Sequence, residues 1–268
     1  MLAALVSLRL LTLNCLFRGN AAARLATLAR ELQGSKLDIL CLQEVVWRRH
    51  VELLGAALPC FPHAAFEPFG LAAKGGLLLM SRWPISHWRY ETYRRRGRWN
   101  TLGFADWLIH KGFQVVRLEV DGEAMVVINT HLLANYAEDW SRESDYALRQ
   151  WDELLQLARS LATIDAGMPL VVAGDLNVPA GSWLYEDFLS STGLRDVFDA
   201  RREPTGRAEL AHKQPAQAID HVLVRLPRER QLHTSARLVF QEELRLVTGK
   251  SGHLSDHFGI EAHITMGR

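Results

Sequence analysis

The sequence predicts an α/β protein in which packed sheets carry helices on their outer faces. Short apolar runs at residues 8–13, 37–42 and 170–173 predict strands, and the run at 170–173 has the composition of a strand buried on both faces. Helical periodicity follows several of these runs, and no repeat, low-complexity tract or linker divides the chain. We therefore expect residues 1–268 to form a single domain, with its sheets packed together and its helices outside.

The remaining strands are recognised by apolar runs that end at turn residues. They are expected at residues 75–81, 86–93, 113–120, 124–130, 219–224, 236–240 and 258–264. Asp121 and Gly122 form a strong turn dipeptide, so the strands on either side of them should make a hairpin. The polar segment 195–215 is expected to be an irregular surface loop.

Four helices are expected. Asn20 caps the first, which buries Leu25, Leu28, Ala29 and Leu32 and stops at Gly34. A second covers residues 46–58, and a short one covers 183–189. Ser141 is expected to cap the longest helix, with an apolar face made by Leu148, Trp151, Leu155, Ala158 and Ala162.

The overall charge excludes a global basic field. The net charge is +1 with a pI near 7.9, so composition alone does not call for a nucleic-acid partner. Cys15 and Cys41 lie in apolar runs and are expected to be buried free thiols. No basic segment precedes the first apolar run, and no run is long enough for a membrane span. We expect a cytoplasmic monomer, with secretion as the alternative.

The most informative stretch is residues 169–178, where a buried strand ends in Gly174, Asp175 and Asn177. We expect Gly174 to turn the backbone, so that the carboxylate and the carboxamide emerge on one side of an extended chain. A buried carboxylate is costly unless it is paired or functional. The alternative is an Asx turn that merely ends the strand.

Polar residues also lie at the ends of the other predicted strands. The full set is Asn14, Glu44, His131, Asp175, Asn177, Asp220, Asp256 and His257. Carboxylates and carboxamides suit a hard cation such as magnesium, or manganese in its place, better than zinc. The sequence has no Cys-x-x-Cys or His-Glu-x-x-His spacing and no Gly-x-Ser-x-Gly elbow. Taken singly, His131 could be an edge-strand histidine, Asp220 a strand cap, and Asn14 a loop anchor.

These strand ends resemble the motifs of the endonuclease/exonuclease/phosphatase superfamily, in the same order and over nearly the whole chain. The motifs are Leu13-Asn-Cys15, Leu42-Gln-Glu44, Asn129-Thr-His131, Gly174-Asp-Leu-Asn177, Ile219-Asp-His221 and Ser255-Asp-His257. The resemblance implies a DNase I-like four-layer α/β sandwich, in which two mixed sheets are flanked by helices. It also implies that residues 1–268 are one catalytic domain that hydrolyses phosphodiesters with magnesium.

The resemblance further implies a role for each residue. Glu44 would be the main magnesium ligand, helped by Asn14 and Asp256. His257, paired with Asp220, would activate water or stabilise phosphoryl charge. Asp175 and Asn177 would position the nucleophile and a phosphate oxygen, with His131 beside the phosphate. Either Asp175 or His257 could be the general base.

A finer resemblance connects three segments to the neutral sphingomyelinases. They are residues 106–112, 130–136 and 252–257, although Leu133 stands where that group has histidine. This implies a phospholipase C that releases a phosphorylated head group, possible action at a membrane surface, and substrate contacts from Lys111, Asn135 and Tyr136. Tyr136 and Trp107 could instead simply pack, and the Arg94–Arg98 cluster could bind an anionic surface or be a solvated loop tip.

Three other functions remain as alternatives: a nuclease acting on DNA or RNA, a phosphatase for a soluble ester, and a non-catalytic module with the same fold. The nuclease is disfavoured by the near-neutral charge.

Overall fold

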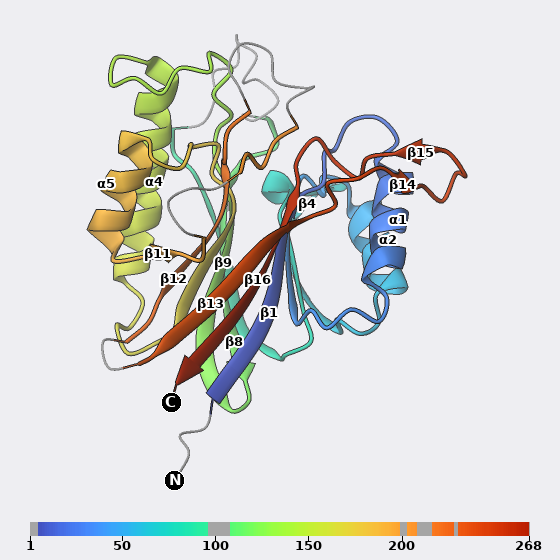
Figure 1. Cartoon of the computed structure of the whole chain (residues 1–268), viewed down its shortest axis with the longest axis horizontal. Coiled ribbons are helices and arrows are strands. Elements are labelled where there is room, and N and C mark those ends of the chain that lie inside the picture. Colours follow the sequence, from blue (N-terminus) through green and yellow to red (C-terminus); the bar gives the residue numbers. More distant parts are fainter. Residues whose placement is uncertain (1–4, 96–107, 199–202, 208–215, 228–229, 268) are drawn as a thin grey trace.

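The computed structural model describes residues 5–95, 108–198, 203–207, 216–227 and 230–267. Two six-stranded mixed sheets pack face to face, and helices cover the outer face of each (Figure 1). The predicted α/β class and the four-layer sandwich are therefore confirmed.

Each sheet combines strands that are distant in sequence. The first sheet has the order β13 (Leu232–Val239), β16 (Gly259–Gly267), β1 (Leu5–Asn14), β2 (Ile39–Gln43), β6 (Leu78–Ser81) and β3 (His63–Ala65). The second has the order β11 (Arg195–Asp196), β12 (Asp220–Arg225), β10 (Leu170–Asp175), β9 (Glu123–His131), β8 (Gly112–Val120) and β7 (Ile85–Thr92). Two small hairpins stand outside them: β4 (Pro68–Phe69) with β5 (Ala72–Ala73), and β14 (Leu244–Arg245) with β15 (Ser251–Gly252).

The helices form the outer layers. The first sheet is covered by α1 (Ala21–Leu32) and α2 (Arg48–Ala57), and the second by α4 (Asp145–Ala162) and α5 (Trp183–Thr192). Among the described residues, no helix is long and apolar enough to cross a membrane.

Apolar side chains on both faces of the central strands explain the sandwich. In β1, Leu8 and Leu10 face the other sheet, whereas Leu11 and Leu13 pack under α1 and α2. In β10, Val171 packs between the sheets and Val172 packs under α4 and α5. Burying both faces in this way contributes about 25 cal/mol per Å² of apolar surface removed from water.

Several local predictions are confirmed. Asn20 caps α1, where its side chain accepts a hydrogen bond from the Ala23 amide. The β8–β9 hairpin turns through Asp121 and Gly122, both with positive φ. Cys15 and Cys41 are buried free thiols.

The long helix differs from its prediction. Ser144, not Ser141, caps α4, and the buried face includes Ala147, Gln150, Leu154, Leu157 and Leu161. Trp151 and Ala158 of the expected face do pack against the core, but they are only partly buried, and the fully buried face is displaced by one residue so that it includes the polar Gln150. Its side-chain amide donates to the Leu133 and Asn177 carbonyls and so needs the interior position.

Two other segments also differ from the predictions. The strand expected at residues 75–81 begins only at Leu78, because Gly75 and Gly76 lie in a short 3₁₀ turn, Lys74–Gly76. The segment expected as a loop at residues 195–215 begins with strand β11 and contains fully buried Thr205.

Candidate active site

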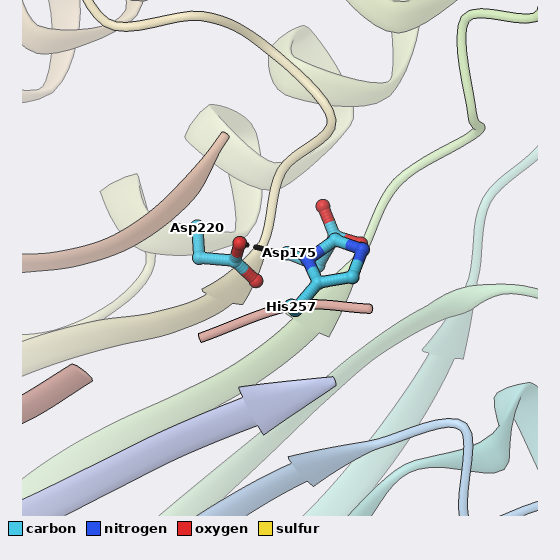
Figure 2. Close-up of side chains that lie close together, drawn as sticks. All are labelled: Asp175, Asp220 and His257. Atoms are coloured by element: carbon cyan, nitrogen blue, oxygen red, sulfur yellow. Dashed lines mark hydrogen bonds and ion pairs between the residues drawn. The ribbon is translucent and has the colours of Figure 1, made fainter. Parts of the chain in front are cut away.

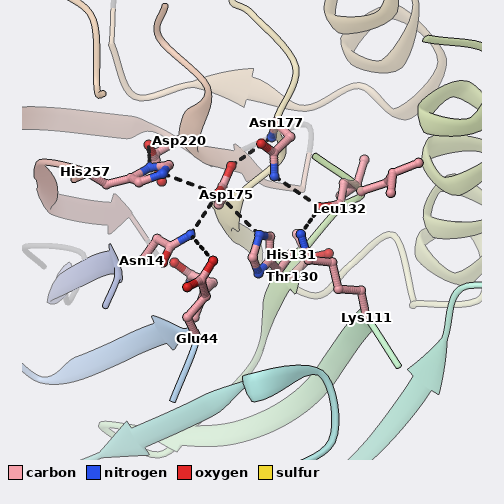
Figure 3. Close-up of polar contacts among 12 residues, drawn as sticks. Asn14, Glu44, Lys111, Thr130, His131, Leu132, Asp175, Asn177, Asp220 and His257 are labelled. Atoms are coloured by element: carbon pink, nitrogen blue, oxygen red, sulfur yellow. Dashed lines mark hydrogen bonds and ion pairs between the residues drawn. The ribbon is translucent and has the colours of Figure 1, made fainter. Parts of the chain in front are cut away.

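The polar strand ends meet at one edge of the two sheets (Figure 3). Strand β10 is central, because Asp175 is paired with His131 of β9 on one side and with Asp220 of β12 on the other. The neighbouring sheet brings Asn14 from the end of β1, and Glu44 follows directly after β2. Since β9 lies between β8 and β10, His131 is not an edge-strand residue.

Gly174 allows β9 and β10 to approach closely. Its φ is 147°, and a Cβ there would lie 2.0 Å from the Thr130 carbonyl oxygen. The expectation that Gly174 turns the chain was wrong, because β10 continues to Asp175. The chain turns instead at Asn177, whose φ is 51° and whose amide donates to Asp175 Oδ1 at 2.9 Å. The sequence offered an Asx turn as the alternative to a functional role for Asp175. The structure has both the Asx turn and the group of polar strand-end residues around Asp175.

Asp175 is the hub of the site and is 1% exposed. Asn14 Nδ2 donates to its Oδ2 at 3.0 Å, and His131 Nε2 lies 3.4 Å from the same oxygen. Burial alone would raise the pKa of Asp175, but the charge of His257 and the hydrogen bond from His131 outweigh it. The pKa of Asp175 consequently lies well below its usual value, and the carboxylate is anionic.

Asp220 and His257 form a direct pair (Figure 2). His257 Nδ1 lies 2.8 Å from Asp220 Oδ2, while His257 Nε2 points toward Asp175 Oδ2 at 3.8 Å. Burial would lower the pKa of His257, but the charges of Asp220 and then Asp175 raise it well above its usual value. The imidazole is thus held protonated between two carboxylates. Asp220 is more than a strand cap.

Thr205 and Arg207, which were not predicted, hold this pair in place. Thr205 Oγ1 accepts the amide of Asp220 at 3.1 Å, and the Thr205 carbonyl accepts the amide of Phe258 at 2.7 Å. The Arg207 guanidinium donates to the carbonyls of Ser255, Gln241 and Phe240. Because the neighbouring residues are polar, the sequence predicted a surface loop here. No signal in the sequence distinguishes Thr205 and Arg207 from the other residues of that loop. Thr205 and Arg207 reach this position because Gly206, which lies between them, forms an antiparallel bridge with His257.

Glu44 and Asn14 form the other side of the site. Asn14 Nδ2 also donates to Glu44 Oε1 at 3.3 Å, so one carboxamide connects Glu44 to Asp175. Glu44 Oε2 accepts the Phe17 amide at 2.8 Å. Glu44 has φ 60°, a left-handed conformation that is uncommon for this residue type and typical of functional positions. Asn14 is also a loop anchor, because its Oδ1 accepts the Leu16 amide at 3.1 Å.

The residues divide into two halves by charge. We call His131, Asp175, Asp220 and His257 the histidine half, and Asn14, Glu44 and Asp256 the oxygen half. Asp175, Asp220 and His257 offer atoms that all lie within 4.8 Å of one another, a spacing that could hold a metal. However, the paired, protonated His257 has no lone pair free for a cation.

The oxygen half fits a divalent cation better. Glu44 and Asp256 supply carboxylates and Asn14 supplies a carboxamide, the oxygen donors that magnesium prefers. In the described part of the chain, no lysine, arginine or histidine forms an ion pair with Glu44 or Asp256. Arg24 acts on both only at longer range. The donor chemistry and the lack of a direct ion-pair partner for Glu44 or Asp256 among the described residues both match a bound cation.

The three residues predicted to contact substrate are placed differently from one another. Lys111 is 2% exposed, and its Nζ donates to the Leu132 carbonyl at 2.9 Å, as does the side chain of Asn177 at 3.1 Å. Asn135 donates to the Asp139 carbonyl at 2.7 Å, and the Tyr136 ring packs edge-on against Tyr146. Lys111 is therefore a buried residue that binds the backbone next to the site, whereas Asn135 and Tyr136 make contacts that stabilise the loop after β9.

Part of the sequence prediction lies outside the described residues, namely Asp106, Trp107, Arg96, Arg98 and Trp99. Of the described arginines in the predicted cluster, Arg95 pairs with Asp152 of α4 at 2.6 Å.

Residues 11–257 match the family described as Endonuclease/Exonuclease/phosphatase family. The chain belongs to this family. Its geometry agrees with the match, because motif residues from separate strand ends, among them Asn14, Glu44 and Asp175, converge on one edge of the sandwich (Figure 3). The name of the family covers nucleases and phosphatases, which are hydrolases of phosphoric esters.

The chain is also similar to individual proteins and solved structures. The chain is 26% identical over 282 residues to the Drosophila melanogaster "Putative neutral sphingomyelinase", covering 98% of this chain but only 61% of that protein. Beta toxin from Staphylococcus aureus, with bound magnesium ions, has a TM-score of 0.75 at 15% identity and covers 96% of this chain and 99% of that one. D. rerio TDP2 complexed with a single-strand DNA product has a TM-score of 0.72 at 13% identity, covering 98% and 99%. At such identities the two structures establish the fold alone.

Proposed function

We propose that this protein is a divalent-cation-dependent phosphodiester hydrolase, and that its substrate is a phospholipid cleaved on the head-group side. The observation that carries the proposal is the continuous polar path from Glu44 through Asn14 and Asp175 to His257. It joins a site suited to a cation directly to a protonated histidine. Both are needed where negative charge develops on a phosphoryl group.

The oxygen half would hold the cation, which we propose to be magnesium or manganese. Glu44 is the principal ligand, and Asn14 and Asp256 complete the set. When bound, the cation would neutralise charge on the phosphoryl oxygens. Support comes from the donor set of this chain and from the magnesium ions in the beta toxin structure.

The histidine half would handle protons. With its pKa raised by Asp220, His257 is a cation at neutral pH and is suited to stabilise phosphoryl charge and donate a proton. Asp175, whose pKa is lowered, is suited to accept a hydrogen bond from the attacking water and orient it. Asn177 and His131 flank that position. We therefore assign the water-orienting role to Asp175 and the acid role to His257.

A phospholipid is favoured over DNA by charge and by relatedness. A DNA-tracking enzyme neutralises several backbone phosphates and needs a basic groove, whereas this chain has a net charge of only +1. The neutral sphingomyelinase match covers 98% of the chain. Lys111 adds positive charge beneath the reacting group, and Asn135 and Tyr136 would form the side of a small head-group pocket.

The deciding experiment compares kcat/KM of the full chain for sphingomyelin, glycerophospholipids, and single- and double-stranded DNA, with and without EDTA. We expect release of a phosphorylated head group that EDTA abolishes, and weak or no cleavage of DNA. Lys111→Ala should severely reduce lipid hydrolysis, because it removes a buried charge beside the site. Conversely, efficient DNA cleavage without head-group release would establish the nuclease alternative.

A further inference from the structure

Three large apolar side chains stand exposed on the chain that continues from Glu44. Trp47 precedes α2, Phe69 lies in β4, and Leu71 is in the turn between β4 and β5. They are 43%, 48% and 81% exposed, and we call them the apolar rim. Trp47 and Leu71 line the same surface hollow. Grouped exposure of this kind marks an interaction surface, unlike the scattered apolar residues of ordinary surfaces.

The apolar rim is fastened to the oxygen half by backbone contacts. The Val45 amide donates to the Gly76 carbonyl at 2.9 Å, and the Ala73 amide donates to the Val46 carbonyl at 2.8 Å. The Arg48 amide donates to the Leu71 carbonyl at 2.9 Å, which ties the hairpin turn to the start of α2. Gly76 packs so close to Glu44 that a Cβ would lie 3.1 Å from the Glu44 Cα. The rim consequently has a fixed position relative to the proposed cation ligand.

The side chains around the rim indicate a lipid surface. Arg48 and Arg49 are both exposed; Arg48 pairs with Glu52 of the same hollow at 3.1 Å, whereas the Arg49 guanidinium lies 5.8 Å from the centre of the Trp47 ring. Tryptophan beside arginine is typical of residues that settle at a membrane interface, where the ring enters the acyl boundary and the cation meets phosphate. Arg49 is therefore the cation that complements the negative head groups of an anionic leaflet.

The size of the rim also favours a lipid surface over a protein partner. A stable protein–protein interface buries about 800 Å² on each side and uses roughly 20 to 30 residues. The rim offers three side chains, the most exposed of them at the turn of a hairpin whose strands have two residues each. Such a small projection suits insertion into head groups.

We propose that the apolar rim inserts into a phospholipid interface and holds the active site against the membrane. The inference rests on the proposed function, because docking beside Glu44 is useful when the scissile phosphodiester belongs to a membrane lipid. In Figure 1, β4 lies just beyond the end of β1 that carries Asn14. Docking there would bring head groups to the oxygen half.

The test measures sedimentation of the full chain with phosphatidylcholine–sphingomyelin vesicles, with and without phosphatidylserine. We expect Leu71→Ser and Trp47→Ala each to weaken vesicle binding roughly tenfold, because each removes one inserted apolar side chain. The matched control is Leu148→Ser on α4, which is 43% exposed like Trp47 and should bind as the wild type. Arg49→Gln, which leaves the Arg48–Glu52 pair intact, should reduce the preference for phosphatidylserine and its salt sensitivity.

A second measurement separates docking from catalysis. Hydrolysis of soluble bis(p-nitrophenyl) phosphate should be unchanged in Leu71→Ser and Trp47→Ala, because neither residue belongs to the site. Unaltered vesicle binding in both variants would overturn the inference. So would a wild-type dimer, detected by analytical ultracentrifugation, that Leu71→Ser dissociates while vesicle binding persists. If the wild type hydrolyses neither ester nor lipid, the proposed function fails, and the vesicle assay still decides the docking.

Discussion

The two halves of the candidate active site accommodate their carboxylates in different ways. In the histidine half, two carboxylates face two imidazoles, and each carboxylate has a histidine nitrogen within 3.4 Å. In the oxygen half, Glu44 and Asp256 have neutral hydrogen-bond donors instead: a backbone amide, a carboxamide and the Ser255 hydroxyl. The histidine half is balanced by the protein itself. In the described part of the chain the oxygen half has no ion-pair partner of this kind, which makes it the half that we propose to hold the cation.

Replacing Glu44 with Gln should have the largest effect, because it removes charge from the unbalanced half while keeping its shape. We expect activity to fall on the order of a thousandfold, together with loss of magnesium binding in calorimetry. Asp175→Asn is the matched control from the balanced half. It should abolish activity comparably and leave magnesium affinity nearly unchanged. Equal loss of affinity in both variants would mean that the two halves do not differ as described.

Breaking the Asp220–His257 pair should come next. Each of His257→Ala and Asp220→Ala should lower kcat on the order of a hundredfold, the usual range for positioned acid–base groups. The double variant should lose little more than either single variant, because the two residues act as one unit. Steady-state kinetics on a soluble diester will measure this. If the losses multiply, the pair does not work as a unit.

Substitutions at Thr205 test whether the activity of the Asp220–His257 pair depends on the hydrogen bonds that Thr205 accepts. Thr205→Val removes the hydroxyl that accepts the part-buried Ile219 amide and the buried Asp220 amide, so both lose that acceptor. We expect roughly a tenfold loss of kcat with little change in KM, and a loss of about 1–3 kcal/mol in the free energy of unfolding. Thr205→Ser retains the hydroxyl and should recover most of both. A Ser variant as impaired as Val would assign the effect to packing.

The smallest effect should be in the pH dependence of stability. The raised pKa of His257 means that its paired charge stabilises the fold fully below about pH 6.5, the usual pKa of an unfolded histidine. This contribution is lost as the pH rises through the folded-state pKa. Urea denaturation at about pH 6 and pH 9 should therefore show a larger fall in stability for the wild type than for His257→Gln. Parallel curves would show that His257 titrates alike in both states.

Much of the fold could be predicted because the pattern of apolar residues is local and strong. The β8–β9 hairpin followed from the Asp121-Gly122 turn, and the α1 cap followed from Asn20. The α4 face was missed because Gln150 is buried for the sake of the carbonyls of Leu133 and Asn177, which are distant in sequence. Apolar periodicity carries no information about such partners.

The sequence by itself determined the inventory of the site, because carboxylates, carboxamides and histidines at the ends of buried strands have few other uses. Tertiary structure decided how these groups divide. Asp175 contacts His131, His257 and Asn14, whereas Glu44 accepts hydrogen bonds from neutral donors. This difference depends on the register of β9, β10 and β12 and on the packing of one sheet against the other. Tertiary structure also decided that Thr205 supports the Asp220–His257 pair and that Trp47 and Leu71 line one hollow. Electrostatic interactions depend on distances of a few ångströms between residues far apart in the chain, and only the folded backbone sets those distances.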